Sequence, residues 1–337
     1  MKNKKVFIIA EIAQAHEGSL GIAHSYIDVL AECGVDAIKF QTHIAEAESS
    51  EFESFRVKFS FEDETRFDYW KRMEFTKEQW LGLKEHCDNK GLEFISSPFS
   101  CAAVDLLEEI GVKRFKIGSG EMTNFLMLSK IANTGKPIIL SSGMSDYKEL
   151  QQCIEFLKPF GNEVSLLQCT TAYPTKPEQW GLGEISALKS RFDIPVGFSD
   201  HSSDITAGIA AVSLGAEILE FHATFHKDMF GPDAKASLSI DETKQLVQSV
   251  RALELALNAE NTKEDMSQFS ELKNLFGKSL AVNKNLSKGD TIDINDLESK
   301  KPGDKGISAR EFQSVLGKKL LRDKTQWQFL SNSDIEN

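Results

Sequence analysis

The stretch GAEILEFHAT (residues 215–224) contains the pattern that decides the fold. It begins with a glycine, which can adopt the left-handed conformation that ends a helix, and continues as an apolar run. Within the run, Glu220 and His222 are two residues apart, so both side chains lie on one face of a strand. The stretch therefore predicts a helix end, a buried strand and a polar strand terminus in succession.

Seven other apolar runs repeat this arrangement: VFIIAE (6–11), AIKFQ (37–41), EFISSPF (93–99), RFKIGSG (114–120), PIILSSG (137–143), VSLLQCT (164–170) and IPVGFSDH (194–201). Amphipathic helical patterns such as SYIDVLAEC (25–33) separate them. Six of the seven helix-to-strand turns carry a glycine, and the seventh carries Asp193; the glycines are Gly34, Gly91, Gly111, Gly135, Gly161 and Gly215. Eight strand–helix units predict a closed (β/α)8 TIM barrel, with an open doubly wound sheet as the alternative.

Three segments lie outside this repeat. An acidic, Phe-rich insert at 45–75 is longer than ordinary barrel loops and predicts a lid or a substrate wall. The barrel is expected to occupy residues 1–258. A polar helical linker (259–276) and a small module of short strands and Lys-Gly-Asp turns (277–337) are expected to follow it.

Composition excludes several classes of function. The 337 residues carry a net charge of −12, which argues against nucleic acid or an anionic membrane as partner. No apolar run approaches the ~20 residues of a membrane span. The five cysteines form no CxxC pair, which favours a reducing compartment over a disulfide framework. We therefore expect a cytoplasmic protein.

Two histidines end neighbouring strands of the predicted barrel, where barrel enzymes place their chemistry. His201 and His222 are expected to point inward together and to hold one divalent metal, since imidazole suits Mn²⁺, Fe²⁺ or Zn²⁺. The alternative is a pair of hydrogen-bonding histidines without metal. His226 is expected at the surface, and no role is assigned to four other histidines, His16, His24, His43 and His86.

Two lysines lie within strands, where burial is costly unless the ammonium binds an anion or forms a Schiff base. Lys116 leads into KIGSGE (116–121), whose amides and serine predict a phosphate cradle. Lys39 could hold a carboxylate, so phosphoenolpyruvate fits both lysines. The cradle could be completed by Ser97 and by Ser141 or Ser142. The alternative for either lysine is an ion pair with Glu11, Glu121 or Glu220.

The chain resembles the sialic acid synthase family, which condenses phosphoenolpyruvate with an N-acetylhexosamine. The resemblance covers nearly the whole chain, through the motifs AEIAQAHEGSL (10–20), IKFQTH (38–43), ISSPFS (95–100), KIGSGE, PIILSSGM (137–144), TTAYPT (170–175), GFSDHS (197–202), GPDAKASL (231–238) and KKPGDKGIS (300–308). Residues 277–337 resemble the family's antifreeze-like domain, which in relatives covers the barrel of a partner chain. The resemblance thus implies a domain-swapped homodimer.

The resemblance also implies roles for individual residues. Phosphoenolpyruvate would contact Lys39, Ser97, Lys116, Ser119, Ser141, Ser142 and Ser199. An N-acetylated amino sugar would contact Gln41, Thr171, Tyr173, Glu220, Asp233 and Lys301. His201 and His222 would hold Mn²⁺, a Lewis acid for the sugar aldehyde. Glu11 or Glu121 would serve as acid–base partner while C3 of phosphoenolpyruvate attacks the aldehyde and C–O cleavage releases phosphate.

Four departures from the family pattern leave the acceptor open, and one of them is the insert segment FDYWKRMEF (67–75). Lys301 stands where sialic acid-specific relatives usually have arginine, Thr171 replaces a frequent asparagine, and Phe221 replaces a frequent arginine. The product could be N-acetylneuraminate, a legionaminic- or pseudaminic-type acid, or another amino sugar acid. The rival classes are a Schiff-base aldolase or lyase using Lys39 or Lys116, and a non-enzymatic carbohydrate- or ice-binding protein.

Overall fold

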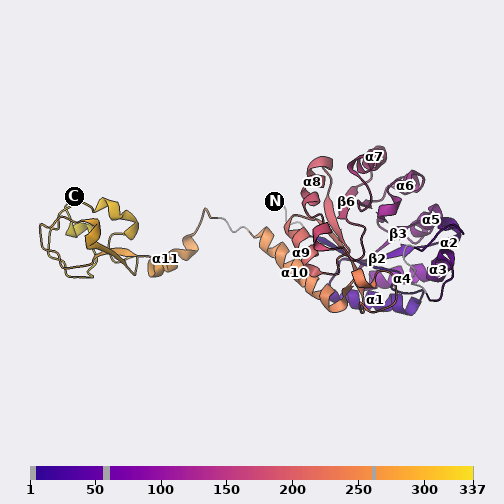
Figure 1. Cartoon of the computed structure of the whole chain (residues 1–337), viewed down its shortest axis with the longest axis horizontal. Coiled ribbons are helices and arrows are strands. Elements are labelled where there is room, and N and C mark those ends of the chain that lie inside the picture. Colours follow the sequence, from indigo (N-terminus) through magenta and orange to yellow (C-terminus); the bar gives the residue numbers. More distant parts are fainter. Residues whose placement is uncertain (1–4, 56–60, 260–262, 337) are drawn as a thin grey trace. The chain divides into compact units, whose positions relative to one another are not determined.

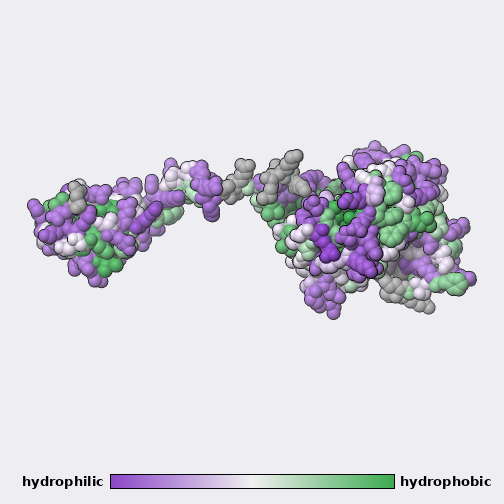
Figure 2. Space-filling view, turned by 90° about the horizontal axis from the view of Figure 1, so that it is seen from above, coloured by the Kyte–Doolittle hydropathy of each residue, from purple (hydrophilic) through white to green (hydrophobic). Residues whose placement is uncertain are grey.

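The computed structural model describes residues 5–55, 61–259 and 263–336. The chain divides into two compact units, Met1–Ala259 and Glu260–Asn337. Figure 2 shows mainly hydrophilic residues on the visible face of each unit, with smaller hydrophobic areas among these residues. In the described part of the chain, no helix is long and apolar enough to span a bilayer.

Unit 1 is a (β/α)8 barrel, which confirms the predicted fold. The sheet has the order β3-β2-β1-β8-β7-β6-β5-β4, every neighbouring pair on this path is parallel, and β3 contacts β4 to close the ring. The strands are β1 (Phe7–Ala13), β2 (Ala37–Thr42), β3 (Glu93–Pro98), β4 (Phe115–Ile117), β5 (Ile138–Ser141), β6 (Val164–Cys169), β7 (Val196–Asp200) and β8 (Ile218–Thr224). A two-residue strand, β9 (Leu238–Ser239), pairs with β8.

Helices cover the outside of the barrel, as Figure 1 shows for unit 1. They are α1 (Leu20–Cys33), α4 (Lys77–Asn89), α5 (Cys101–Glu109), α6 (Phe125–Ala132), α7 (Tyr147–Leu157), α8 (Gly183–Phe192), α9 (Ile205–Ser213) and α10 (Ile240–Asn258). The glycines predicted at six helix-to-strand turns all have φ between 71° and 94°, and Asp193 has φ 50°. Left-handed residues at these turns let each helix stop and the next strand begin.

The inside of the barrel has two layers of different chemistry. The lower layer is an apolar cluster, the barrel floor, made by Ile9, Ala37, Ile95, Ile139, Leu167 and Ile218. Two residues further along each of these strands, the inward side chain is polar or a thiol: Glu11, Lys39, Ser97, Ser141, Cys169 and Glu220. The period of two along a strand thus places a polar layer directly on the apolar floor.

The insert between β2 and α4 packs over one side of the barrel mouth. It contains α2 (Ala45–Glu48) and α3 (Arg66–Met73), and residues 56–60 lie outside the described part. Thr65 and Asp68 cap α3 reciprocally, which fixes where this helix begins. Ala45, Tyr69, Trp70 and Met73 form a small buried cluster of their own.

Unit 2 is a small module with its own core. An antiparallel pair, β10 (Ser279–Val282) and β11 (Leu297–Lys300), packs with loop residues around a core that includes Val282, Val315 and Leu330. The predicted linker is not one continuous helix in the described residues, because α10 ends at Asn258 and the short α11 spans Ser270–Phe276. Residues 260–262 of that linker lie outside the described part.

Candidate active site

A cavity of about 400 Å³ opens at the carboxyl ends of the barrel strands. It gathers fifteen of the seventeen side chains that the sequence nominated. They are Glu11, Lys39, Gln41, Ser97, Lys116, Ser119, Glu121, Ser141, Thr171, Tyr173, Ser199, His201, Glu220, His222 and Asp233. Parallel strands bring these residues together although they lie far apart in the sequence.

Two nominated residues are placed elsewhere. Ser142 does not line the cavity, because it follows Ser141 directly and adjacent residues face opposite sides of the sheet. Its hydroxyl donates to Gln168 (3.3 Å) and accepts from the backbone N–H of Cys169 (3.2 Å). These contacts give Ser142 a structural role, and its contact to phosphoenolpyruvate stays a prediction. Lys301 belongs to unit 2, where its ammonium lies 5.1 Å from the ring centroid of Phe276.

Two lysines and two glutamates form a buried charge network in the polar layer. Lys39 Nζ lies 2.7 Å from Glu11 Oε2 and 3.8 Å from Glu220 Oε1. Lys116 Nζ lies 3.1 Å from the same Glu220 oxygen, and the Ser199 hydroxyl donates to that oxygen at 3.1 Å. The ion pairs that were the alternative for both lysines are thus present, and an anionic ligand would share the lysines with these carboxylates.

The pKa values of the two glutamates in this network are shifted in opposite directions. Burial raises the pKa of Glu11 to about 7, against the lowering effect of Lys39. Burial would also raise the pKa of Glu220, but Lys116 and Lys39 hold it below its ordinary value. Glu11 is therefore the carboxyl placed to exchange a proton near neutral pH, while Glu220 stays ionised.

Two serine hydroxyls in the polar layer point to a bound ligand. The side-chain oxygens of Ser97 and Ser141 are buried, and neither has a hydrogen-bond partner among the described residues. A buried hydroxyl without a partner costs free energy, about 1–3 kcal/mol in mutational data. An anionic oxygen between these hydroxyls and Lys116 would satisfy all three groups.

Side chains pack closely around Gly143, behind the cavity wall. A Cβ atom built there would lie 2.4 Å from Thr171 Oγ1 and 2.7 Å from Ser119 Oγ, so a larger residue would force these two side chains to move. The Gly143 N–H donates to the Ser119 hydroxyl at 3.2 Å. This contact holds Ser119 in place, and the crowding at the Cβ position favours glycine after the two serines of PIILSSG.

The two strand-end histidines lie side by side, with ring centroids 5.2 Å apart. The Nδ1–H of His201 donates to the Thr170 carbonyl (2.9 Å), and burial lowers the pKa of His201 to about 4, so its ring is neutral. Its Nε2 lone pair then faces the Tyr173 hydroxyl, 3.1 Å away. The described residues contain no cluster of three or more His, Cys, Asp or Glu side chains fit to hold a metal. Two imidazoles suit an open site whose other positions are filled by water or substrate.

Above the charge network, the cavity wall carries groups suited to a polar acceptor. Tyr173, Thr171 and Asp233 line this part. Glu121 lines it as well, accepts a hydrogen bond from Asn124 (2.8 Å), and has its pKa raised by burial. Hydroxyl and carboxyl groups in one wall fit a polyhydroxylated substrate.

Sequence reasoning missed part of the wall. The insert contributes five residues, Glu48, Glu53, Arg66, Tyr69 and Trp70, which fits the expected substrate wall. No periodic pattern marks them, because their placement depends on how the insert folds. Gln14 and Cys169 also line the cavity. Cys169 could have been found, since it stands two residues after Leu167 in β6.

Comparison with known proteins gives a consistent result. The chain matches the model of the NeuB family over residues 26–262. It is 36% identical over 321 residues to N,N'-diacetyllegionaminic acid synthase of Campylobacter jejuni, covering 94% of this chain and 96% of that protein. It is also 36% identical over 319 residues to human N-acetylneuraminate-9-phosphate synthase, covering 94% of this chain and 88% of that protein.

A solved structure shares the fold. The crystal structure of an N-acetylneuraminic acid synthetase from Leptospira borgpetersenii, in complex with citrate, superposes with a TM-score of 0.71 at 32% identity. The match covers 80% of this chain and 91% of that one.

Proposed function

Because the chain belongs to the NeuB family, we propose that it is a nonulosonic acid synthase. It condenses phosphoenolpyruvate with an N-acetylmannosamine-type amino sugar and releases phosphate. Relatives at 36% identity carry names of this enzyme class. The observation in the cavity that carries the proposal is the buried group of Lys116, Ser97 and Ser141, in which one cation and two unpartnered hydroxyls converge.

Both anionic groups of phosphoenolpyruvate would find partners in the polar layer. Its phosphate would take the hydroxyls of Ser97 and Ser141 together with Lys116 and Ser119, and its carboxylate would take Lys39. Charge-assisted hydrogen bonds of this kind are the strong ones, and they gain further strength in a site closed by an apolar floor. The shared carboxylate of Glu220 keeps both ammonium groups in place between turnovers.

The reaction then needs one group that moves a proton near the joining carbons. C3 of phosphoenolpyruvate attacks the aldehyde carbon of the open-chain sugar, whose oxygen takes up a proton. Water adds to C2, and the C2–O bond breaks to release phosphate and leave a keto acid. Glu11 is the proposed acid–base residue, because its pKa of about 7 suits proton transfer at neutral pH.

His201 and His222 are the proposed metal ligands, with Mn²⁺ the favoured ion. A divalent ion bound there would supply Lewis acidity to the aldehyde oxygen of the acceptor. The Thr170 carbonyl holds the His201 ring in the orientation that leaves Nε2 directed at the cavity. Hydrogen bonding of the second ring nitrogen is the usual support for a ligating histidine.

We propose that the enzyme works as a domain-swapped homodimer, in which unit 2 of one chain covers the barrel of the other. The basis is the resemblance of residues 277–337 to the antifreeze-like domain and the separate core of unit 2. Lys301 is the proposed acceptor contact from the partner chain.

The acceptor is the open part of the proposal. Relatives of similar identity make N-acetylneuraminate 9-phosphate or N,N'-diacetyllegionaminic acid, as their names state. Thr171 and Lys301 depart from the sialic acid-specific pattern, so legionaminic- and pseudaminic-type acids remain candidate products. A Schiff-base mechanism is disfavoured, because Glu11 and Glu220 raise the pKa of Lys39 although burial alone would lower it.

The test is phosphate release from phosphoenolpyruvate with a panel of 2-acetamido and 2,4-diacetamido hexoses, free and 6-phosphorylated, and mass spectrometry of the products. We expect one acceptor class to give a nine-carbon keto acid. Borohydride in the presence of a keto acid should leave the enzyme active, whereas a labelled lysine would indicate the Schiff-base class. Release of phosphate with no acceptor would contradict the proposal.

A further inference from the structure

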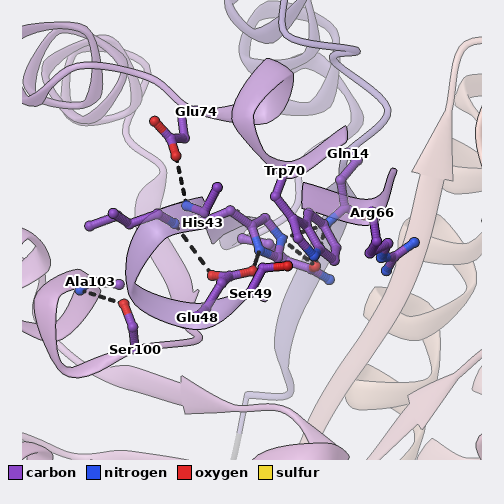
Figure 3. A network of polar contacts seen from close by, with 12 residues as sticks. Gln14, His43, Glu48, Ser49, Arg66, Trp70, Glu74, Ser100 and Ala103 are labelled. Atoms are coloured by element: carbon purple, nitrogen blue, oxygen red, sulfur yellow. Dashed lines mark hydrogen bonds and ion pairs between the residues drawn. The ribbon is translucent and has the colours of Figure 1, made fainter. Parts of the chain in front are cut away.

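His43 is a buried histidine next to the active-site cavity that the proposed reaction does not use. It follows Gln41 by two residues at the end of β2 and is only 2% exposed. Its ring is stacked between Trp70 of α3 (centroids 3.8 Å apart) and Phe99 (4.6 Å). Figure 3 shows His43 and Trp70 among the polar contacts of this region.

Both ring nitrogens of His43 have partners, and these partners determine where the proton lies. Nδ1 lies 2.7 Å from a carboxylate oxygen of Glu48, and Nε2 lies 2.8 Å from the amide nitrogen of Gln14 and 3.3 Å from Oε1 of Gln41. An amide nitrogen only donates, so Nε2 accepts. The ring proton is therefore on Nδ1 and is donated to Glu48, whose second oxygen accepts the backbone N–H of Ile44 at 3.3 Å.

A chain of hydrogen bonds with fixed donors and acceptors connects His43 to Glu11, the proposed acid–base residue. The amide nitrogen of Gln14 also donates to Oε1 of Gln41, and Nε2 of Gln41 donates to Oε1 of Glu11 at 2.9 Å. Each of the two amides is thus held in one of its two possible orientations. One amide hydrogen of Gln41 remains for the cavity that Gln41 lines.

Reversing the first link would reverse the others. A proton on Nε2 of His43 would require the oxygen of Gln14 in place of its amide nitrogen. Gln41 would then lose its short hydrogen bond from Gln14 and keep only the longer contact of 3.3 Å to Nε2 of His43. If its amide turned to donate to Gln14, it would place an oxygen against the carboxylate of Glu11. Two acceptors in contact repel each other in a buried site.

We propose that His43 is a positioning residue, which through Gln14 fixes the amide of Gln41 so that its NH2 group serves both Glu11 and the acceptor. The inference rests on the proposed function for its reaction, and on contacts within the described residues for its geometry. Glu48 and Trp70 both come from the insert, so the folding of the insert onto the barrel sets the orientation of an active-site amide.

Packing alone does not account for these contacts. A phenylalanine ring could fill the space between Trp70 and Phe99 equally well, and it would avoid burying two ring nitrogens. The nitrogens are needed only for the contacts to Glu48, Gln14 and Gln41. This difference allows packing and positioning to be separated by substitution.

The first experiment compares His43→Phe, Gln14→Leu and the double variant in steady-state kinetics. We expect His43→Phe to leave the KM for phosphoenolpyruvate unchanged and to lower kcat/KM for the acceptor about tenfold, the effect of losing one hydrogen-bond link in a buried chain. Because both residues act on Gln41 through one chain, the double variant should be little worse than either single one. Additive losses, or an unchanged kcat/KM in His43→Phe, would overturn the proposal.

The second experiment reads the chain without any reaction. Nitrogen NMR of the wild-type protein labelled at histidine, with His43→Gln used for assignment, reports which ring nitrogen carries the proton. We expect His43 to be protonated at Nδ1 and bare at Nε2, and the Nε2 signal to shift in Gln14→Leu. A proton on Nε2 in the wild-type protein would refute the inference. If no acceptor on the panel is turned over, the proposed function fails, and this NMR result alone decides the role of His43.

Discussion

Lys116 and Glu220 form an ion pair in the active-site cavity, with Lys116 Nζ 3.1 Å from Glu220 Oε1. The same oxygen lies 3.8 Å from the ammonium of Lys39, so one carboxylate serves two cations. A ligand with two anionic groups can take the place of that shared carboxylate at both lysines without leaving either charge unpaired.

Lys116→Ala should therefore weaken phosphoenolpyruvate binding. Loss of a charge-assisted contact, about 1.5–3 kcal/mol, is expected to raise the KM for phosphoenolpyruvate tenfold or more. Steady-state kinetics and calorimetric titration measure this effect. An unchanged KM would place the phosphate elsewhere in the cavity.

Ser141 and Ser142 offer a matched pair for substitution. They are neighbours in the sequence, but the side chain of Ser141, the last residue of β5, lines the cavity and that of Ser142 does not. Ser141→Ala removes a hydroxyl directed at the cavity and should raise the KM for phosphoenolpyruvate about fivefold, as expected for one hydrogen bond of about 1 kcal/mol. Ser142→Ala should instead lower the free energy of unfolding by about 1 kcal/mol, since Cys169 N–H loses its acceptor. Equal effects of the two variants on KM would contradict this assignment.

Metal removal should abolish turnover if His201 and His222 hold the ion. We expect EDTA-treated enzyme to be inactive and to recover best with Mn²⁺. Either histidine-to-alanine variant should lose at least about tenfold in metal affinity. His226→Ala is the control, because that side chain is 72% exposed and pairs with Asp228. Full turnover by metal-free enzyme would refute the metal site.

His16 should make the barrel less stable as the pH falls. Burial, followed by His43 and Arg72, lowers its pKa to about 3, and its Nδ1 accepts the N–H of Gly18 at 3.1 Å. A histidine whose folded pKa is lowered contributes stability above its unfolded pKa of about 6.5, and this stability is lost as the pH falls toward the folded value.

The check is denaturant unfolding of wild type and His16→Asn at about pH 7.5 and about pH 5. Protonation of the unfolded histidine costs the wild type about 2 kcal/mol at the lower pH. The destabilisation caused by His16→Asn should therefore be about 2 kcal/mol smaller at pH 5. If the difference in unfolding free energy between wild type and His16→Asn does not change with pH, His16 titrates normally in the folded protein.

Mixing two inactive variants tests the proposed homodimer. Lys301→Ala and His222→Ala chains should together regain about a quarter of wild-type activity, because half of the randomly formed dimers have one intact site. His201→Ala mixed with His222→Ala is the control, since both lesions affect the barrel and no intact site forms. A mixture of the first pair that stays inactive although heterodimers form would disprove the shared site.

The sequence predicted the barrel because both of its signals are local. Each turn needs a left-handed residue, which glycine supplies, and each strand shows its inward face by a period of two. The same period identified Lys39 with Gln41 and Glu220 with His222. The period continues from Gln41 to His43, so the sequence carries the same signal for that residue.

Other features depend on contacts that local patterns do not encode. The sequence offers two successive serines for the phosphate site and does not show which of them faces the cavity. The register of β5 determines that Ser141 faces inward. The insert wall depends on the packing of α3 against the barrel, as the stack of Trp70 on His43 shows. The expected linker helix is absent from the described residues 259 and 263–269, where polarity favours a helix but nothing specifies its continuity.

The two layers inside the barrel bear on how such an enzyme can change its substrate. Truncating a floor residue such as Ile95 or Leu167 is expected to cost about 2–5 kcal/mol, enough to threaten folding. The polar side chains two residues beyond them include the buried ion pair of Glu11 and Lys39, and removing one partner of such a pair is expected to cost about 3–5 kcal/mol. These side chains also belong to the proposed phosphoenolpyruvate and acid–base groups. Selection can thus alter the acceptor at wall residues outside this layer, such as Thr171 and Tyr173, while the two layers keep the barrel folded and phosphoenolpyruvate bound. A directed-evolution library confined to that wall would explore new amino sugars at low risk of unfolded clones.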